Sequence, residues 1–210
     1  YVQDPASRLA VFALAPEPGM RVLDVCAAPG GKSFAAALQM YDEGEIWSCD
    51  LHPHKKTLIQ KGALRLGLQC IHPKTADGKV RIPEWEGTFD RVLVDAPCSG
   101  LGVIRKKPDI RYKDPVSLEE LPQVQRTILE NAASYVKGGG VLVYSTCTIL
   151  DRENCGVIDA FLAAHPEFRR EAFSLPGPAG TAAEGQITLW PQIHGTDGFY
   201  ICRLRKDEIL

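Results

Sequence analysis

The chain has 210 residues, of which 45% are apolar, and its formal net charge is −2. It contains no uninterrupted apolar run of about 18 residues, which excludes an ordinary membrane-spanning helix. The weak net charge excludes a uniformly basic nucleic-acid binder, although a local basic stripe would be enough to hold RNA. We therefore expect one globular domain over residues 1–210.

Strand and helix patterns alternate along the chain. In order, we predict a strand at 21–26, a helix at 33–41, a strand at 45–50, a helix at 54–66, strands at 68–72 and 89–95, a helix at 117–136, a strand at 140–145, a helix at 151–164 and a strand at 199–204. The helix at 117–136 opens with a capping-box pattern of Ser117 and Glu120. Residues 175–185 form a loop rich in Gly, Pro and Ala, in which no residue pattern indicates a function. The alternation predicts an α/β fold, in which helices cover both faces of a mostly parallel sheet.

The seven cysteines indicate the cellular setting. Their number is odd and several lie in apolar, strand-like stretches. This favours a reducing compartment over a disulfide framework, so we expect a cytoplasmic protein. No spacing of Cys and His is typical of zinc, and we expect no metal site.

The first predicted strand runs into a glycine-rich turn that opens the next helix. Small residues there let a ligand approach the backbone, and a helix N-terminus attracts negative charge. Asp50 ends the second strand, where an acid can accept hydrogen bonds from ribose hydroxyls, and Asp77 can accept one from an adenine amino group. The pattern predicts an adenosine-containing cofactor. The turn consists of Cys26, Ala27, Ala28, Pro29, Gly30, Gly31 and Lys32.

Other interpretations of this turn are weaker. Gly31-Lys32-Ser33 imitates the end of a phosphate-binding P-loop, but that motif requires a glycine where this chain has Cys26. The dinucleotide fingerprint GxGxxG is also missing from the sequence. A tight turn without a ligand would explain the glycines alone, but it does not explain the acids that follow the next two strands.

Two cysteines follow neighbouring predicted strands. Cys98 stands in the segment 95–100 (DAPCSG) and Cys147 in the segment 145–148 (STCT). One cysteine after a strand is more often a small buried apolar residue, but two facing one crevice favour chemistry. A thiolate that adds to carbon 6 of cytosine enables carbon 5 to attack the methyl group of S-adenosylmethionine. Asp95 would then interact with the ring nitrogen or amino group, and either cysteine is a candidate nucleophile.

A basic segment, residues 103–113, directly follows the Cys98 loop. We expect its side chains to contact RNA phosphates, with a solvated loop face as the alternative. Its basic residues, with Tyr112 among them, are Arg105, Lys106, Lys107, Arg111 and Lys113.

Taken together, these motifs resemble the Sun/Fmu family of RNA cytosine-5 methyltransferases, and in particular its RsmB-like members, which act on 16S ribosomal RNA. The resemblance covers nearly the whole chain. Its most specific part is the pairing of a Pro-Cys with a Thr-Cys motif, because related DNA enzymes use only the first. It rests on residues 2–7, 26–32, 50, 77–78, 95–100, 103–110, 145–148 and 196–199.

The resemblance implies a class I S-adenosylmethionine-dependent methyltransferase fold, which is Rossmann-like with an antiparallel last strand. It implies that Cys147 is the nucleophile and that Cys98 assists product release. It further implies that residues 26–32, Asp50, Asp77 and Asp95 bind S-adenosylmethionine. RsmB-like proteins also carry an N-terminal RNA-binding domain, which we do not expect in this chain, where residues 1–19 form an N-terminal motif segment.

The expected activity is therefore methylation of carbon 5 of a cytosine in RNA, with ribosomal RNA as the expected partner and no membrane partner. A transfer RNA or DNA substrate is an alternative. A DNA enzyme would use Cys98, but the roughly 50 residues after the last predicted helix are too few for a target-recognition domain. A catalytically silent RNA-binding module is a third possibility, against which the two cysteines argue.

Overall fold

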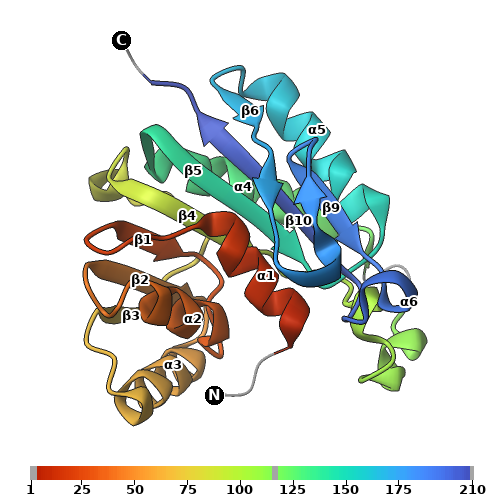
Figure 1. Cartoon of the computed structure of the whole chain (residues 1–210), viewed down its shortest axis with the longest axis horizontal. Coiled ribbons are helices and arrows are strands. Elements are labelled where there is room, and N and C mark those ends of the chain that lie inside the picture. The colour runs from red at the N-terminus through yellow and green to blue at the C-terminus, as the bar shows by residue number, and fades with distance from the viewer. Residues whose placement is uncertain (1–3, 115–117, 209–210) are drawn as a thin grey trace.

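The computed structural model describes residues 4–114 and 118–208, which fold around a large mixed β-sheet (Figure 1). Its strands lie in the order β3, β2, β1, β4, β5, β10 and β6, and β9 also pairs with β10. The strands from β3 to β5 are parallel, whereas β10 is antiparallel to each of its partners. Their bounds are β1 (Arg21–Asp24), β2 (Glu45–Asp50), β3 (Ile71–Thr75), β4 (Phe89–Asp95), β5 (Val136–Thr146), β6 (Phe168–Arg170), β9 (Gln186–Leu189) and β10 (Phe199–Lys206).

Alternate residues along each strand face two separate hydrophobic clusters. In β5, Val141 and Val143 pack under α1 (Pro5–Leu14), α2 (Gly31–Gln39) and α3 (Pro53–Leu66). Leu142 and Tyr144 face the opposite side, under α4 (Leu121–Tyr135) and α5 (Cys155–Ala164). Burial on both faces explains why the strands read as nearly continuous apolar runs. The predicted α/β fold with helices on both faces is confirmed.

The predicted bounds of β2 and β4 are correct, and the other strands differ at their ends. β1 stops at Asp24, two residues earlier than expected, because the chain turns there and the Val25 N–H donates to the Leu93 carbonyl at 3.0 Å. β3 begins at Ile71, three residues later than expected. β5 begins at Val136, which the sequence assigned to the preceding helix.

The starts of two helices also differ from the prediction. Ser117 of the predicted capping box lies outside the described residues. Helix α4 begins at Leu121, and Glu120 precedes it without a side-chain cap bond. Ahead of α5, Asp151–Glu153 form a 3₁₀ turn, so the α-helix itself starts at Cys155.

Helix α1 was not predicted, although its start carries clear signals. Pro5 occupies the first turn, and the Ala6 N–H donates to Oδ1 of the N-cap residue Asp4 at 2.9 Å. The short C-terminal elements β6 to β9 and α6 (Pro191–His194) were not predicted either. Strands of two to four residues are too short to show a hydrophobic period. Two of these, β7 (Phe173–Ser174) and β8 (Thr181–Ala182), form a separate hairpin.

The parallel strands present their carboxyl ends at one edge of the sheet. β4 and β5 are in register, with Asp95 beside Ser145, so the segments that follow them leave the sheet side by side. Ligands of open α/β sheets bind at this edge. Within residues 4–114 and 118–208, no helix is long and apolar enough to cross a membrane.

Candidate active site

Cys98 and Cys147 lie together at this edge, with their Sγ atoms 3.3 Å apart. The hydrogen bond with Cys147 and burial raise the pKa of the Cys98 thiol far above its ordinary value. The same hydrogen bond, together with the positive charge of Lys32, lowers the pKa of Cys147 despite its burial. These opposite shifts favour Cys147 over Cys98 as the thiol that loses its proton, and the thiolate is the nucleophilic form of cysteine.

A buried polar network holds the two cysteine loops in place. The Ser99 N–H donates to Oε2 of Glu153 at 2.9 Å, and the Ser99 hydroxyl is 2.8 Å from that of Thr148. Gln125 Nε2 donates to the Pro97 carbonyl and to the same Glu153 oxygen, each at 2.9 Å. Glu153 is fully buried. Glu153 and Gln125 were not predicted as part of the site, since polar helical residues are usually exposed and nothing in a single sequence marks these two as inward-facing.

Asp95 is fixed between two donors. Its Oδ2 accepts from Lys32 Nζ at 2.5 Å, and its Oδ1 accepts from the Ser145 hydroxyl at 2.8 Å. Lys32 Nζ also donates to the Ser7 hydroxyl at 2.8 Å and lies 5.4 Å from the centre of the Phe199 ring. Burial alone would lower the pKa of Lys32, but the charge of Asp95 and its hydrogen bond raise it overall. The ammonium of this predicted cofactor-loop residue therefore reaches the reactive centre.

The glycine-rich turn opens α2 as expected. Gly30 precedes the helix with φ +110°, a conformation that favours glycine, and an added Cβ would meet the Phe34 ring at 2.4 Å. Residues 26–30 follow β1 directly, so they line the edge at which a cofactor would lie. Burial raises the pKa of the Cys26 thiol, which therefore stays protonated and serves packing.

The acids predicted to bind a nucleoside keep free acceptor capacity. Asp50 is 6% exposed; its Oδ1 accepts from the His52 N–H at 3.2 Å, while no described residue donates to its Oδ2. Asp77 Oδ1 accepts from the Lys79 N–H at 2.9 Å, and Asp77 lines a small, mostly apolar cavity with Val25. These acceptors fit an adenosine group, with ribose hydroxyls at Asp50 and the base beside Asp77.

Asp24, which the sequence analysis did not single out, is a further buried carboxyl at this edge. Its Oδ2 accepts from the Ser33 hydroxyl at 2.7 Å, whereas Oδ1 has no hydrogen-bond partner among the described residues. Burial raises the pKa of this carboxyl to about 7. An orphaned buried acceptor next to the glycine-rich turn is consistent with a ligand that supplies a donor.

The structure divides the five basic residues of the predicted RNA-binding segment into two groups. Arg105 lies 3.6 Å from the buried Asp197, and Lys106 pairs with Asp197 at 2.8 Å and with Asp4. Lys113 Nζ donates to the Ser99 carbonyl at 2.9 Å. These three side chains have partners within the protein, and their predicted contacts with RNA stay a prediction. Lys107 and Arg111 are exposed and have no acidic partner among the described residues, so they are available to phosphates.

No group of three or more His, Cys, Asp or Glu side chains that could hold a metal ion was found in the described part of the chain.

Comparison with known proteins places this site in a family. A family model described as "16S rRNA methyltransferase RsmB/F" matches residues 11–205. Over 98% of its length the chain is 46% identical to the "Probable ribosomal RNA small subunit methyltransferase B" of Bacillus subtilis, and it covers 47% of that protein. It is 40% identical to "Ribosomal RNA small subunit methyltransferase B" of Thermus thermophilus, covering 97% of this chain and 49% of the relative. The chain thus spans about half the length of the curated relatives it matches.

Solved structures give the same result for the fold. The crystal structure of PH0851 superposes with a TM-score of 0.90 at 38% identity, over 98% of this chain and 47% of that chain. "The crystal structure of NSun6 from Pyrococcus horikoshii with SFG" gives a TM-score of 0.84 at 28% identity, over 100% of this chain and 53% of that one. The expectation of a methyltransferase fold is confirmed.

Proposed function

This chain belongs to the RsmB/F family of 16S rRNA methyltransferases, and on that premise we propose that it transfers a methyl group from S-adenosylmethionine to carbon 5 of a cytosine in RNA. The observation that carries the proposal is the pair of thiols 3.3 Å apart beside the glycine-rich turn. Methyl transfer to oxygen or an amino nitrogen needs no nucleophilic thiol, whereas carbon 5 of cytosine becomes reactive only after a nucleophile adds to carbon 6.

The residues of the candidate active site have the following roles in the proposed reaction. Sγ of Cys147 bonds to carbon 6, and electron density moves to carbon 5, which becomes the nucleophile. S-adenosylmethionine, when bound along residues 26–30, Asp50 and Asp77, supplies the methyl group. Carbon 5 then loses its proton to water, the bond between Sγ and carbon 6 breaks, and its electrons return to sulfur. Asp95 lies where it can accept a hydrogen bond from the cytosine amino group.

Cys98 assists the last step through the contact that it makes in the free protein. Its Sγ lies 3.3 Å from Sγ of Cys147, and a hydrogen bond from the Cys98 thiol stabilises the Cys147 thiolate as it leaves carbon 6. A protonated Cys98 is a poor nucleophile, which supports Cys147 in that role. The seven free cysteines support a cytoplasmic setting, in which thiols stay reduced.

The site of methylation tests the proposal. We expect bisulfite sequencing of 16S rRNA to show a cytosine that is protected in cells with the full-length gene and converted in cells without it. The purified full-length protein should restore protection when S-adenosylmethionine is added. Labelled methyl recovered on a ribose hydroxyl or on a base nitrogen would show that the reaction does not pass through carbon 5.

Asp50 should contribute strongly to cofactor affinity. Asp50→Ala removes an acceptor for two ribose hydroxyls, and we expect calorimetric titration to show binding of S-adenosylmethionine weakened by about 2–4 kcal/mol. Glu130→Ala is a control, because Glu130 is a partly exposed acid on α4, on the other face of the sheet, where it pairs only with Arg126 among the described residues. Unchanged cofactor affinity in Asp50→Ala would remove Asp50 from the binding site.

A further inference from the structure

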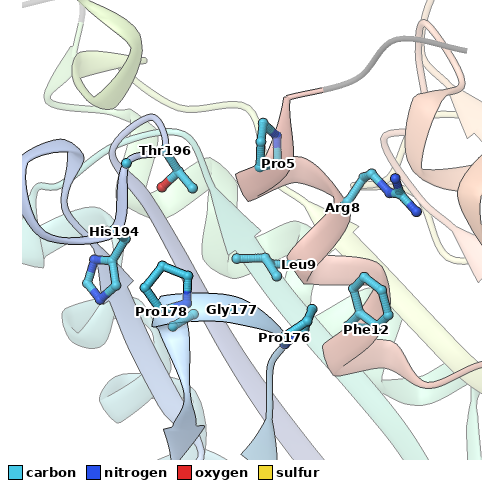
Figure 2. Close-up of a pocket in the computed structure, with 11 residues that line it drawn as sticks. Pro5, Arg8, Leu9, Phe12, Pro176, Gly177, Pro178, His194 and Thr196 are labelled. Atoms are coloured by element: carbon cyan, nitrogen blue, oxygen red, sulfur yellow. The ribbon is translucent and has the colours of Figure 1, made fainter.

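A mostly apolar groove lies between α1 and the C-terminal part of the chain (Figure 2). One side is the face of α1 that carries Leu9 and Phe12, and the other is formed by residues 176–179 and 194–196. Its volume is about 420 Å³, which is within the range of small-ligand pockets. The loop 175–185, in which no residue pattern indicated a function, thus contributes residues 176–179 to a concave surface.

The two sides of the groove are tied together by the basic segment. Lys106 forms ion pairs with Asp4, directly before α1, and with Asp197, directly after the groove residue Thr196. Asp197 is 4% exposed and is also contacted by Arg105. These ion pairs connect the two sides of the groove to the basic segment that also carries the exposed Lys107.

On both sides of the groove, residues that are close in sequence to its lining contact the candidate active site around Cys147. On α1, Arg8 lines the groove, while the preceding residue, Ser7, accepts the hydrogen bond from Lys32. On the other side, Gly198 lies two residues beyond Thr196 and donates its N–H to the Gly102 carbonyl at 2.9 Å, and Gly102 donates to the Cys147 carbonyl at 3.0 Å. A polymer bound at Cys147 would therefore reach the groove with its next units.

The surface of the groove matches the chemistry of an unpaired nucleotide. Phe12 is 40% exposed and lines the groove together with Pro176, so it offers an aromatic surface on which a planar base can stack. Arg8 is exposed and has no acidic partner among the described residues, which leaves it free for a phosphate. Proteins hold single-stranded RNA with this combination of aromatic surface and cationic rim.

We propose that this groove binds one unpaired base of the RNA substrate, next to the target cytosine in the chain. The inference rests on the proposed function. In this inference, α1 and residues 176–196 take part in substrate selection. The protein binds RNA better when the nucleotide next to the target cytosine is unpaired than when it is base-paired.

The experiment uses the full-length protein and a set of short RNAs that contain the target cytosine. In each RNA one flanking nucleotide is replaced, either by 2-aminopurine, whose fluorescence falls on stacking, or by an abasic residue. We expect quenching at one flanking position, and an abasic residue at that position should lower kcat/KM roughly tenfold. Phe12→Ala should abolish the quenching and lower kcat/KM on intact RNA by a similar factor, with little further loss on the abasic RNA.

Three variants separate stacking from other effects. Phe12→Trp keeps an aromatic face and should retain the quenching. Leu64→Ala removes an exposed apolar side chain on α3, outside the groove, and should leave every RNA unaffected. Lys107→Glu should weaken binding of intact and abasic RNA equally and reduce the salt dependence of binding.

The outcomes distinguish the two proposals. A wild-type protein that methylates no RNA at carbon 5 refutes the proposed function and the inference together. If methylation proceeds but the losses from Phe12→Ala and from the abasic residue add fully, the groove does not hold the base. Thermal destabilisation by Phe12→Ala with no change in quenching would show that Phe12 supports the fold and does not stack on the base, which refutes the inference.

Discussion

Cys147→Ala should be free of RNA and inactive, whereas Cys98→Ala should become covalently trapped on methylated RNA. Cys147 is the thiol with the lowered pKa, so its loss removes the nucleophile that we propose for carbon 6. Cys98→Ala leaves that nucleophile in place but deletes the hydrogen bond that stabilises sulfur as it departs. Cys147→Ala is therefore blocked before the bond to carbon 6 forms, whereas Cys98→Ala is blocked when that bond has to break.

A denaturing gel with end-labelled RNA separates these cases. For Cys98→Ala we expect a slowly migrating adduct that forms in the presence of S-adenosylmethionine and whose released RNA carries the methyl group. Wild-type protein should show little adduct, and Cys147→Ala none. Cys155→Ala, which alters a thiol outside the pair, should behave as wild type. An adduct that persists in Cys147→Ala and disappears in Cys98→Ala would reverse the roles and match the pattern of a DNA enzyme.

The approach of the two cysteines could be predicted from the sequence, because it follows from local rules. Both follow strands whose apolar runs are unmistakable, and the carboxyl ends of parallel neighbours meet at one edge. The register of β4 and β5 then places Asp95 beside Ser145 and brings the two thiol-bearing segments together. No long-range information beyond strand order was needed.

The sequence could not predict which residues of the basic segment 103–113 form ion pairs within the protein, because those pairs join positions that are distant in sequence. Lys106 meets Asp197, 91 residues further along the chain, and Asp4, 102 residues earlier. A cluster of five basic residues looks uniform in the sequence, yet three of them have partners within the protein. Only the folded structure distinguishes these from Lys107 and Arg111, which have no acidic partner among the described residues.

The position of the Lys32 side chain also depends on a contact that is distant in sequence. In the sequence it belongs to the cofactor turn, with residues 26–31. In the structure its side chain leaves that turn and pairs with Asp95, 63 residues away, within reach of the charge of Cys147. A single side chain thus links the glycine-rich turn to Asp95 and to the surroundings of Cys147.

Lys32→Met should lower stability and abolish methylation, for separable reasons. Lys32 and Asp95 have side chains only 10% and 28% exposed, so removing the ammonium leaves a largely buried carboxylate without its partner. Breaking such a pair costs about 3–5 kcal/mol at full burial, and we expect a loss toward the lower end of that range because Asp95 keeps some contact with water. Methylation should fall to background, because Cys147 loses the nearby positive charge that helps to lower its pKa.

The double variant Lys32→Met/Asp95→Asn separates these effects. With no charge left to bury, its free energy of unfolding should return to within about 1 kcal/mol of wild type, as measured by urea titration. Its methylation rate should stay at background, since neither the ammonium beside Cys147 nor the carboxylate that faces the cytosine is restored. If the double variant regained activity along with stability, the ion pair would be a structural support and both residues would leave the mechanism. If Lys32→Met alone kept wild-type stability, the buried pair would not contribute to folding as its geometry indicates.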